Sequence, residues 1–157
     1  MNSTETQEHA LDMVILYDNL DAGKRAKELC DRIAGRLGDS CKLKLHCGSF
    51  SMLSNPVAAR VVTFQIMSAP CLIVACNGND DLPRPVEAFL KESARVMCGA
   101  GTALVAQLHG IPGGREEQLP AHRCLQQIAA NAGIPFFSEV IETAADDPQP
   151  LTTAKNL

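Results

Sequence analysis

The chain has 157 residues, of which 46% are hydrophobic and 20% are charged, so its composition is that of a folded protein of about one domain. The 18 Asp and Glu residues outnumber the 14 Lys and Arg residues, and this acidic balance argues against nucleic-acid binding, which requires a basic surface. No run of 18 or more apolar residues is present, so we expect no membrane span. Residues 1–9 are polar and carry no apolar signal stretch, and we therefore expect a cytoplasmic protein.

The first half of the chain alternates between strand and helix patterns. Residues 13–17 form an apolar run typical of a strand, and apolar residues at helical spacing follow from 22 to 37, with Asp21 as the expected N-cap and Gly38 as the stop. Residues 42–47 alternate between apolar and polar, which predicts a half-buried strand. A loop over 48–54 is expected next, and Asn55 and Pro56 then begin a helix that extends to about residue 68.

The second half continues the alternation. Residues 71–76 are a continuous apolar strand, 77–81 are turn residues, and a helix begins between 83 and 85 and ends at 99–101. A strand over 102–108 and a Gly/Pro loop over 109–114 come next. A helix that begins between 115 and 121 and ends at Gly133 follows, and then a strand over 136–141. We expect a folded domain over 11–142, a disordered segment over 1–10, and an extended or disordered tail over 143–157.

This order predicts a three-layer α/β domain with a parallel sheet, because each pair of strands is joined by a helical crossover. The first, third and fourth strands are continuous apolar runs, as central strands are, and the second and fifth contain polar residues, as edge strands do. The resulting strand order is 2-1-3-4-5, the flavodoxin-like order. Residues 143–157 show no amphipathic pattern, so the fifth helix of that fold is expected to be missing.

In such a fold a ligand binds beyond the carboxyl ends of the strands, near the first and third. The polar or small residues expected at that crevice are Asp18, Asn19, Asp21, Cys76, Asn77, Gly78, Asp80 and His109. Carboxylates there could hold Mg²⁺, and Cys76 could act as a nucleophile. We favour the simpler interpretation that the acids are turn residues and the thiol is structural, and we expect no metal and no catalytic residue.

The cysteines support a reduced, intracellular chain. Their number is odd and no two have C-x-x-C spacing, so neither a disulfide framework nor a zinc site is predicted. The seven are Cys30, Cys41, Cys47, Cys71, Cys76, Cys98 and Cys124.

The strand and helix order resembles that of the receiver domains of response regulators. Asp18 matches their acidic site, but Cys76 and Asn77 stand where the phosphoacceptor Asp would be, and Leu108 and His109 stand where a hydroxyl residue would be. No Lys follows the last strand until position 155. The resemblance therefore implies a degenerate receiver that does not accept phosphate and that acts in regulation by binding an unidentified protein partner, without catalysis.

Residues 69–76, followed by Leu82, Pro83 and a helix containing Val86 and Phe89, resemble the third strand and next helix of flavodoxins and related flavin reductases. This resemblance implies the alternative function, an oxidoreductase-type protein that binds FMN or a nucleotide. A flavin phosphate needs hydroxyls and free N–H groups at the start of the first helix, whereas residues 17–23 supply two acids. We therefore expect no bound cofactor.

The helix over 56–68 suggests a homodimer. Arg60 is its only charged residue, and its apolar residues extend around most of the helix. The predicted interface residues are Val57, Val61, Val62, Phe64 and Met67. Two alternatives remain open: residues 48–54 could fold over this helix, or the interface could lie at the fifth strand.

Overall fold

The structure, a computed structural model, describes residues 9–38, 41–110 and 118–142. Residues 1–8 of the segment predicted to be disordered over 1–10, and the whole of the predicted tail over 143–157, lie outside the described residues. The first strand already includes residues 9 and 10, so the folded domain begins two residues before the predicted boundary at 11.

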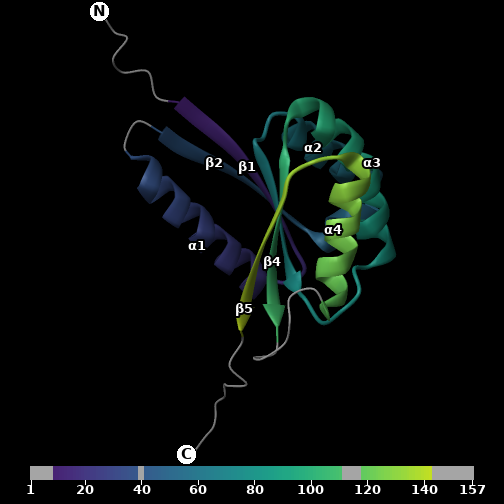
Figure 1. Cartoon of the computed structure of the whole chain (residues 1–157). Coiled ribbons are helices and arrows are strands. Elements are labelled where there is room, and N and C mark those ends of the chain that lie inside the picture. The colour runs from purple at the N-terminus through teal and green to yellow at the C-terminus, as the bar shows by residue number, and fades with distance from the viewer. Residues whose placement is uncertain (1–8, 39–40, 111–117, 143–157) are drawn as a thin grey trace, which may run out of the picture.

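Five parallel strands and four α-helices alternate along the described chain (Figure 1). The elements are β1 (His9–Tyr17), α1 (Leu20–Leu37), β2 (Cys41–Ser49), the 3-10 helix η2 (Phe50–Ser54), α2 (Pro56–Met67), β3 (Cys71–Asn77), α3 (Arg84–Ala100), β4 (Ala103–Gly110), α4 (Pro120–Ala132) and β5 (Phe136–Glu142). The strands lie in the order β2-β1-β3-β4-β5, and each pairs in parallel with its neighbours. The predicted α/β architecture and strand order are therefore confirmed.

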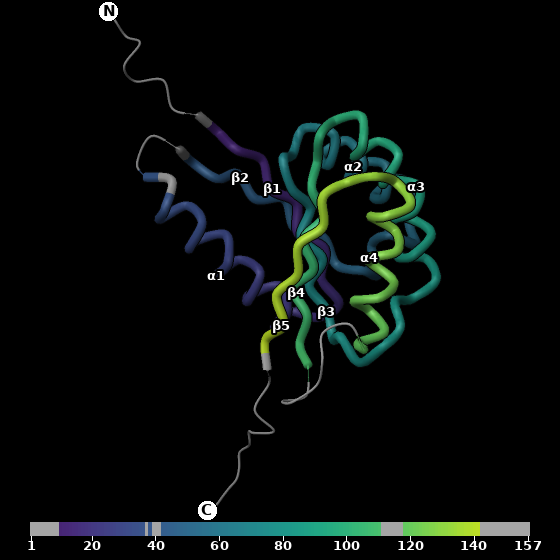
Figure 2. The backbone as a smooth tube through the Cα atoms, viewed as in Figure 1, coloured from purple at the N-terminus to yellow at the C-terminus, as the bar shows by residue number. Residues whose placement is uncertain are grey.

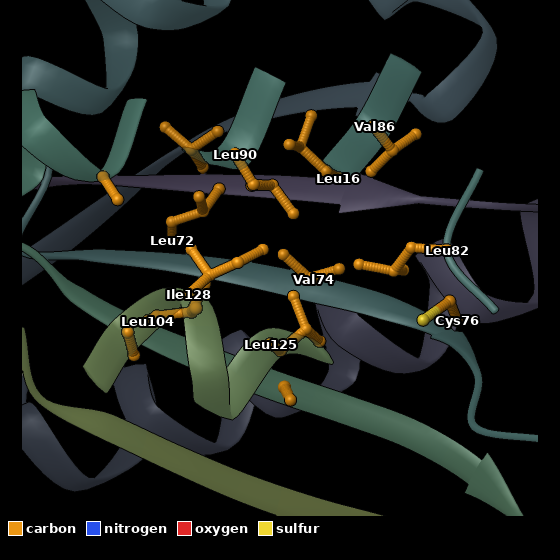
Figure 3. Packing of buried hydrophobic residues seen from close by; sticks show 14 of the residues in the cluster. Leu16, Leu72, Val74, Cys76, Leu82, Val86, Leu90, Leu104, Leu125 and Ile128 are labelled. Atoms are coloured by element: carbon orange, nitrogen blue, oxygen red, sulfur yellow. The ribbon is translucent and has the colours of Figure 1, made fainter. Parts of the chain in front are cut away.

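The helices cover the two sides of the sheet unequally. Helices α2, α3 and α4 lie on one side, and α1 lies alone on the other, as both the cartoon and the backbone tube show (Figures 1 and 2). Residues alternate along each central strand. Val14, Leu16 and Val74 therefore belong to the larger core under α2–α4, whereas Ile15 and Ile73 belong to the smaller core under α1. Figure 3 shows the larger core, in which leucines of the sheet meet Leu90, Leu125 and Ile128 of the helices.

The ends of α1 and α2 follow local capping chemistry. Asn19, not Asp21 as predicted, caps α1, because its Oδ1 accepts a hydrogen bond from the Ala22 N–H at 2.9 Å. Asp21 lies within the first turn instead, where a negative charge is favourable. The predicted cap at Asn55 is confirmed: its side chain accepts from the N–H groups of the second and third residues of α2.

The segment predicted as a loop over 48–54 contains the 3-10 helix η2. Two of its side chains, Phe50 and Leu53, are buried in the larger core, and this burial fixes a segment whose sequence has no helical periodicity. Met52 remains exposed on the same segment. The η2 helix therefore contributes to the core without covering the outer surface of α2.

The side of the sheet that carries α1 is only partly covered. The described residues place no second helix there, and Phe137 of β5 is 61% exposed on that side. Polar contacts cross it instead: Arg32 of α1 lies 3.5 Å from a carboxylate oxygen of Glu139, and the Gln107 amide donates to the other oxygen at 3.1 Å. None of the described helices is long and apolar enough to cross a bilayer.

Candidate functional site

The carboxyl ends of β1, β3 and β4 bring together polar residues from distant parts of the sequence. The Asn77 N–H donates to Asp18 Oδ2 at 3.1 Å, and the Asp18 N–H donates to the carbonyl of Ala75 at 3.2 Å. His109 is the register partner of Asn77 on the next strand. These contacts place Asp18, Asn77 and His109 along one edge of the sheet, at the point where the strand order reverses.

Two small cavities lie at this edge. One, of about 110 Å³, is lined by Asp18, Phe50, Cys76, Asn77, Asp80, Asp81, Leu82 and Pro83. The other, of about 200 Å³, is lined by Asn19, Asp21, Arg25, Asn77, Asn79 and His109, and we call it the α1 cavity. The crevice residues expected from the sequence, except Gly78, are thus divided between two cavities that share Asn77. Arg25 is not among the predicted crevice residues, because it belongs to a row of charged residues on α1 that is typical of a solvent-facing helix surface.

Gly78 has a structural position rather than a ligand-binding one. Its N–H donates to the carbonyl of His109 at 2.8 Å, and its carbonyl accepts from the N–H of Ala121 at 3.3 Å. The backbone of Gly78 therefore joins the end of β4 to the start of α4. It is buried, and it lines neither of the two cavities.

Cys76 lines the first cavity and belongs to the larger core, where it lies beside Leu82 (Figure 3). Burial, together with the charges of Asp18 and Asp80, raises the pKa of its thiol to about 12. Because only the thiolate is a good nucleophile, this environment is the opposite of that of a catalytic cysteine. Cys71 and Cys30 are similar, since burial raises their pKa values to about 11 and about 12.

Thiol labelling measures the reactivity of these cysteines directly. We expect a thiol reagent at neutral pH to modify Cys98, which is exposed, while Cys76 reacts only after the protein is unfolded in denaturant. Peptide mass spectrometry of native and denatured samples would identify the modified residues. Rapid native modification of Cys76 would contradict its assignment as a structural thiol.

The acids at this edge do not form a metal site in the part of the chain that the structure describes. No group of three or more His, Cys, Asp or Glu side chains that could hold a metal ion occurs among the described residues. One oxygen of Asp18 already accepts a hydrogen bond from Asn77.

The start of α1 is also a poor cradle for a flavin phosphate. Such a group would bind the free N–H groups of the first helical turn. Here Asn19 Oδ1 accepts from Ala22, and the next N–H, that of Gly23, donates to the Asn19 carbonyl at 3.0 Å. The Asp21 carboxylate adds negative charge to the same turn. The residues present therefore do not fit a phosphate dianion at this position.

The side chains of Arg25 and His109 contact each other in the α1 cavity. Arg25 Nη1 lies 3.2 Å from His109 Nδ1 and 3.4 Å from Nε2. A guanidinium can only donate, so the imidazole accepts and is neutral in this contact. Burial first, and then the Arg25 charge, lower the pKa of His109, against a smaller opposing effect of Asp18 and Asp21.

Comparison with solved structures identifies the fold. The chain is similar to the flavodoxin of Streptococcus pneumoniae TIGR4, with a TM-score of 0.53 and 15% sequence identity over 83% of each chain. It is also similar to a short-chain flavodoxin associated with a PDU bacterial microcompartment, with a TM-score of 0.54 and 14% identity over 85% of this chain and 84% of that one. No family model and no curated protein matches the sequence. At these identities the likeness concerns the fold alone, and the protein has a flavodoxin-like fold.

Proposed function

We propose that this flavodoxin-like domain is a non-catalytic, regulatory protein-interaction domain that assembles as a homodimer through α2. The observation that carries the proposal is an apolar stripe on the outer surface of that helix, the α2 stripe. Its members are large and exposed: Val57 (70% exposed), Val61 (50%), Phe64 (68%) and Met67 (50%). Contiguous exposed apolar surface of this kind marks interaction sites on proteins.

The stripe is separate from the face by which α2 joins its own domain. Val62 and Ile66 point into the larger core and are at most 3% exposed, so the prediction of Val62 as an interface residue is wrong. Val57, Val61 and Phe64 are spaced four and three residues apart, which places them one above another on the opposite face. The surface of α2 can therefore associate without any change in the fold.

A second copy of this chain is the partner that the stripe fits best. If two α2 helices pack antiparallel about a two-fold axis midway between residues 61 and 64, Val61 of each copy meets Phe64 of the other. Residues on one flank of such a pair face their own symmetry mates, so the two copies of Arg60, the only charged residue of the helix, lie at one exposed rim of the contact and the two copies of Gln65 at the other. The contact is apolar at its centre and polar beside it, as stable interfaces are.

Multi-angle light scattering tests this assignment. We expect the wild-type protein to have twice the mass of the chain at micromolar concentration, and Phe64→Glu to have the mass of one chain, because a carboxylate would be buried at the centre of the contact. Leu20→Glu is the matched control. Leu20 is 71% exposed at the start of α1, so this substitution adds the same charge outside the stripe and should leave the mass unchanged.

Phe137→Glu tests the competing interface on the uncovered side of the sheet. Phe137 is as exposed as the members of the α2 stripe, but it lies on β5, opposite α2–α4. A mass reduced by Phe137→Glu and unchanged by Phe64→Glu would transfer the interface to β5. A wild-type monomer at micromolar concentration would refute the dimer through α2.

A flavin- or nucleotide-dependent oxidoreductase-type function is the second candidate, and the likeness of the fold to two flavodoxins favours it. The capped first turn of α1 and its acid argue against it. Titration of FMN, followed by its fluorescence, separates the two candidates: a partner-binding domain leaves the fluorescence unchanged, and a flavin-binding one quenches it saturably.

A further inference from the structure

We infer that the α1 cavity binds a small carboxylate that carries an adjacent hydrogen-bond donor, such as a hydroxyl or an ammonium group. Nothing in the homodimer through α2 requires such a site, and the cavity lies at the edge of the sheet rather than on that helix. Its lining comes from three places: the first turns of α1, the turn after β3, and the end of β4.

The positive charge of Arg25 favours an anion in the α1 cavity. Arg25 is half-buried, and the group against its guanidinium is the neutral ring of His109. Among the described residues, no carboxylate forms an ion pair with Arg25. A half-buried cation is stabilised by an anion that accepts its remaining hydrogen bonds, and the planar guanidinium fits a carboxylate in a two-pronged contact.

The backbone of Arg25 is also fixed in place. Its carbonyl accepts a hydrogen bond at 3.5 Å from the amide of Gln107, a fully buried residue two positions before His109 on β4. This bond joins the backbone of Arg25 on α1 to β4 at a residue close in sequence to His109. Binding to preformed groups of this kind loses less conformational freedom.

The remaining lining residues select among anions. Asp21 is a carboxylate within the same cavity, and it would repel a phosphate dianion more strongly than a monoanion. The same carboxylate can accept a hydrogen bond from a hydroxyl or ammonium group next to the bound carboxylate. A volume of about 200 Å³ accommodates a small organic acid.

The Asn77 side chain is already oriented for this role. Its Oδ1 accepts from the Asn79 N–H at 2.9 Å, and this fixes the amide at the edge of the cavity. The NH₂ group of the same amide points away from that bond and is a donor only, so it suits an anion. Arg25, His109 and Asn77 thus supply the groups that would hold the anion, and Asp21 supplies the acceptor for the adjacent donor.

NMR of the histidine rings measures binding without any assumed activity. We expect L-lactate to shift the His109 ring signals saturably and to raise the pH at which they titrate, because a bound anion, like Asp18 and Asp21, favours the imidazolium that the Arg25 charge disfavours. Propionate, which lacks the hydroxyl, should bind more weakly, and inorganic phosphate should bind more weakly than L-lactate at pH 7.5, where it is mainly a dianion.

Three variants test whether the shift of the His109 signals arises from binding of L-lactate in the α1 cavity. Arg25→Gln should weaken L-lactate binding at least about tenfold, as expected when a charge-assisted contact is lost. Arg32→Gln is the matched control, because it removes the same charge from the same helix at a residue that contacts Glu139, and it should bind as the wild type does. Asp21→Ala, which leaves no acceptor at this position, should remove the preference for L-lactate over propionate.

Three results would overturn the inference. They are a wild-type protein whose His109 signals do not respond saturably to L-lactate, equal binding of L-lactate by Arg25→Gln and the wild type, and tighter binding of phosphate than of L-lactate. Should Arg25→Gln fail to fold, Arg25→Lys retains the charge without the planar donor pair. It should still lose most of the affinity, and unchanged affinity would contradict the two-pronged contact.

Discussion

Val62→Glu should unfold the domain, whereas Phe64→Glu, two residues along the same helix, should leave it folded. Val62 is 3% exposed in the larger core, and a carboxylate there has no cation to pair with among its core neighbours. Burial of an unpaired charge costs several kcal/mol, a large part of the roughly 5–15 kcal/mol by which a domain is stable. At Phe64, which is 68% exposed, the new carboxylate remains in water.

Circular dichroism during urea unfolding measures the stability of the two variants. The protein concentration should be low enough for the wild type to be monomeric, so that association does not add to the measured free energy of unfolding. Val62→Ala extends the test if Val62→Glu gives no soluble protein. It should lower the free energy of unfolding by about 1–3 kcal/mol, through lost burial and a small cavity. Wild-type stability in Val62→Glu would mean that α2 is rotated about its axis, and would remove the basis of the α2 stripe.

This contrast also shows where sequence reasoning about α2 is limited. The helix is apolar around most of its circumference, with Arg60 as its single charge, so its periodicity does not identify the buried side. The sheet determines which side of α2 is buried. Strands β1 and β3 present Leu16 and Val74 on the side where α2–α4 lie, and Val62 and Ile66 pack into that same core. Four of the five predicted interface residues are exposed, and the fifth is in the core.

The strand order was predictable because burial on both sides of a sheet leaves a clear pattern. Residues 71–76 are apolar at every position, which only a central strand requires, whereas Lys42 and Lys44 alternate with leucines on β2 at the edge. The helix stop at Gly38 was predictable for a local reason, since its φ of 86° favours glycine. Such features depend on neighbours in the sequence and are visible in it.

The composition of the α1 cavity was only partly predictable. Residues at strand ends, such as Asn77 and His109, could be placed at one edge from the strand order alone. Arg25 could not, because its contact with His109 joins residues 84 positions apart. The N-cap was uncertain for a different reason: Asn19 and Asp21 are both good capping residues, and the path of the chain out of β1 selects the first.

Gly78→Ala should destabilise the domain, because three neighbouring residues approach the backbone of Gly78 closely. A Cβ at this position would lie 2.8 Å from Leu119 Cδ1, 3.2 Å from Leu108 Cβ and 3.3 Å from the carbonyl oxygen of His109. The Leu119 side chain can rotate away, but the other two atoms belong to β4 or are attached directly to its backbone. To relieve the close contacts of the new Cβ, the turn after β3 must move away from β4. This movement would strain the 2.8 Å hydrogen bond from the Gly78 N–H to the His109 carbonyl.

We expect Gly78→Ala to lower the free energy of unfolding by about 1–3 kcal/mol, the usual cost of overpacking. Gly35→Ala is the matched control: Gly35 lies inside α1 with nothing within 4 Å of its added Cβ, so the same substitution should stabilise by up to about 1 kcal/mol. Urea unfolding of both variants against the wild type measures the difference. Equal stability of Gly78→Ala and the wild type would show that the turn after β3 moves freely against β4. Asn77 and His109 would then not be held together rigidly, and the α1 cavity would lose this support for ligand binding.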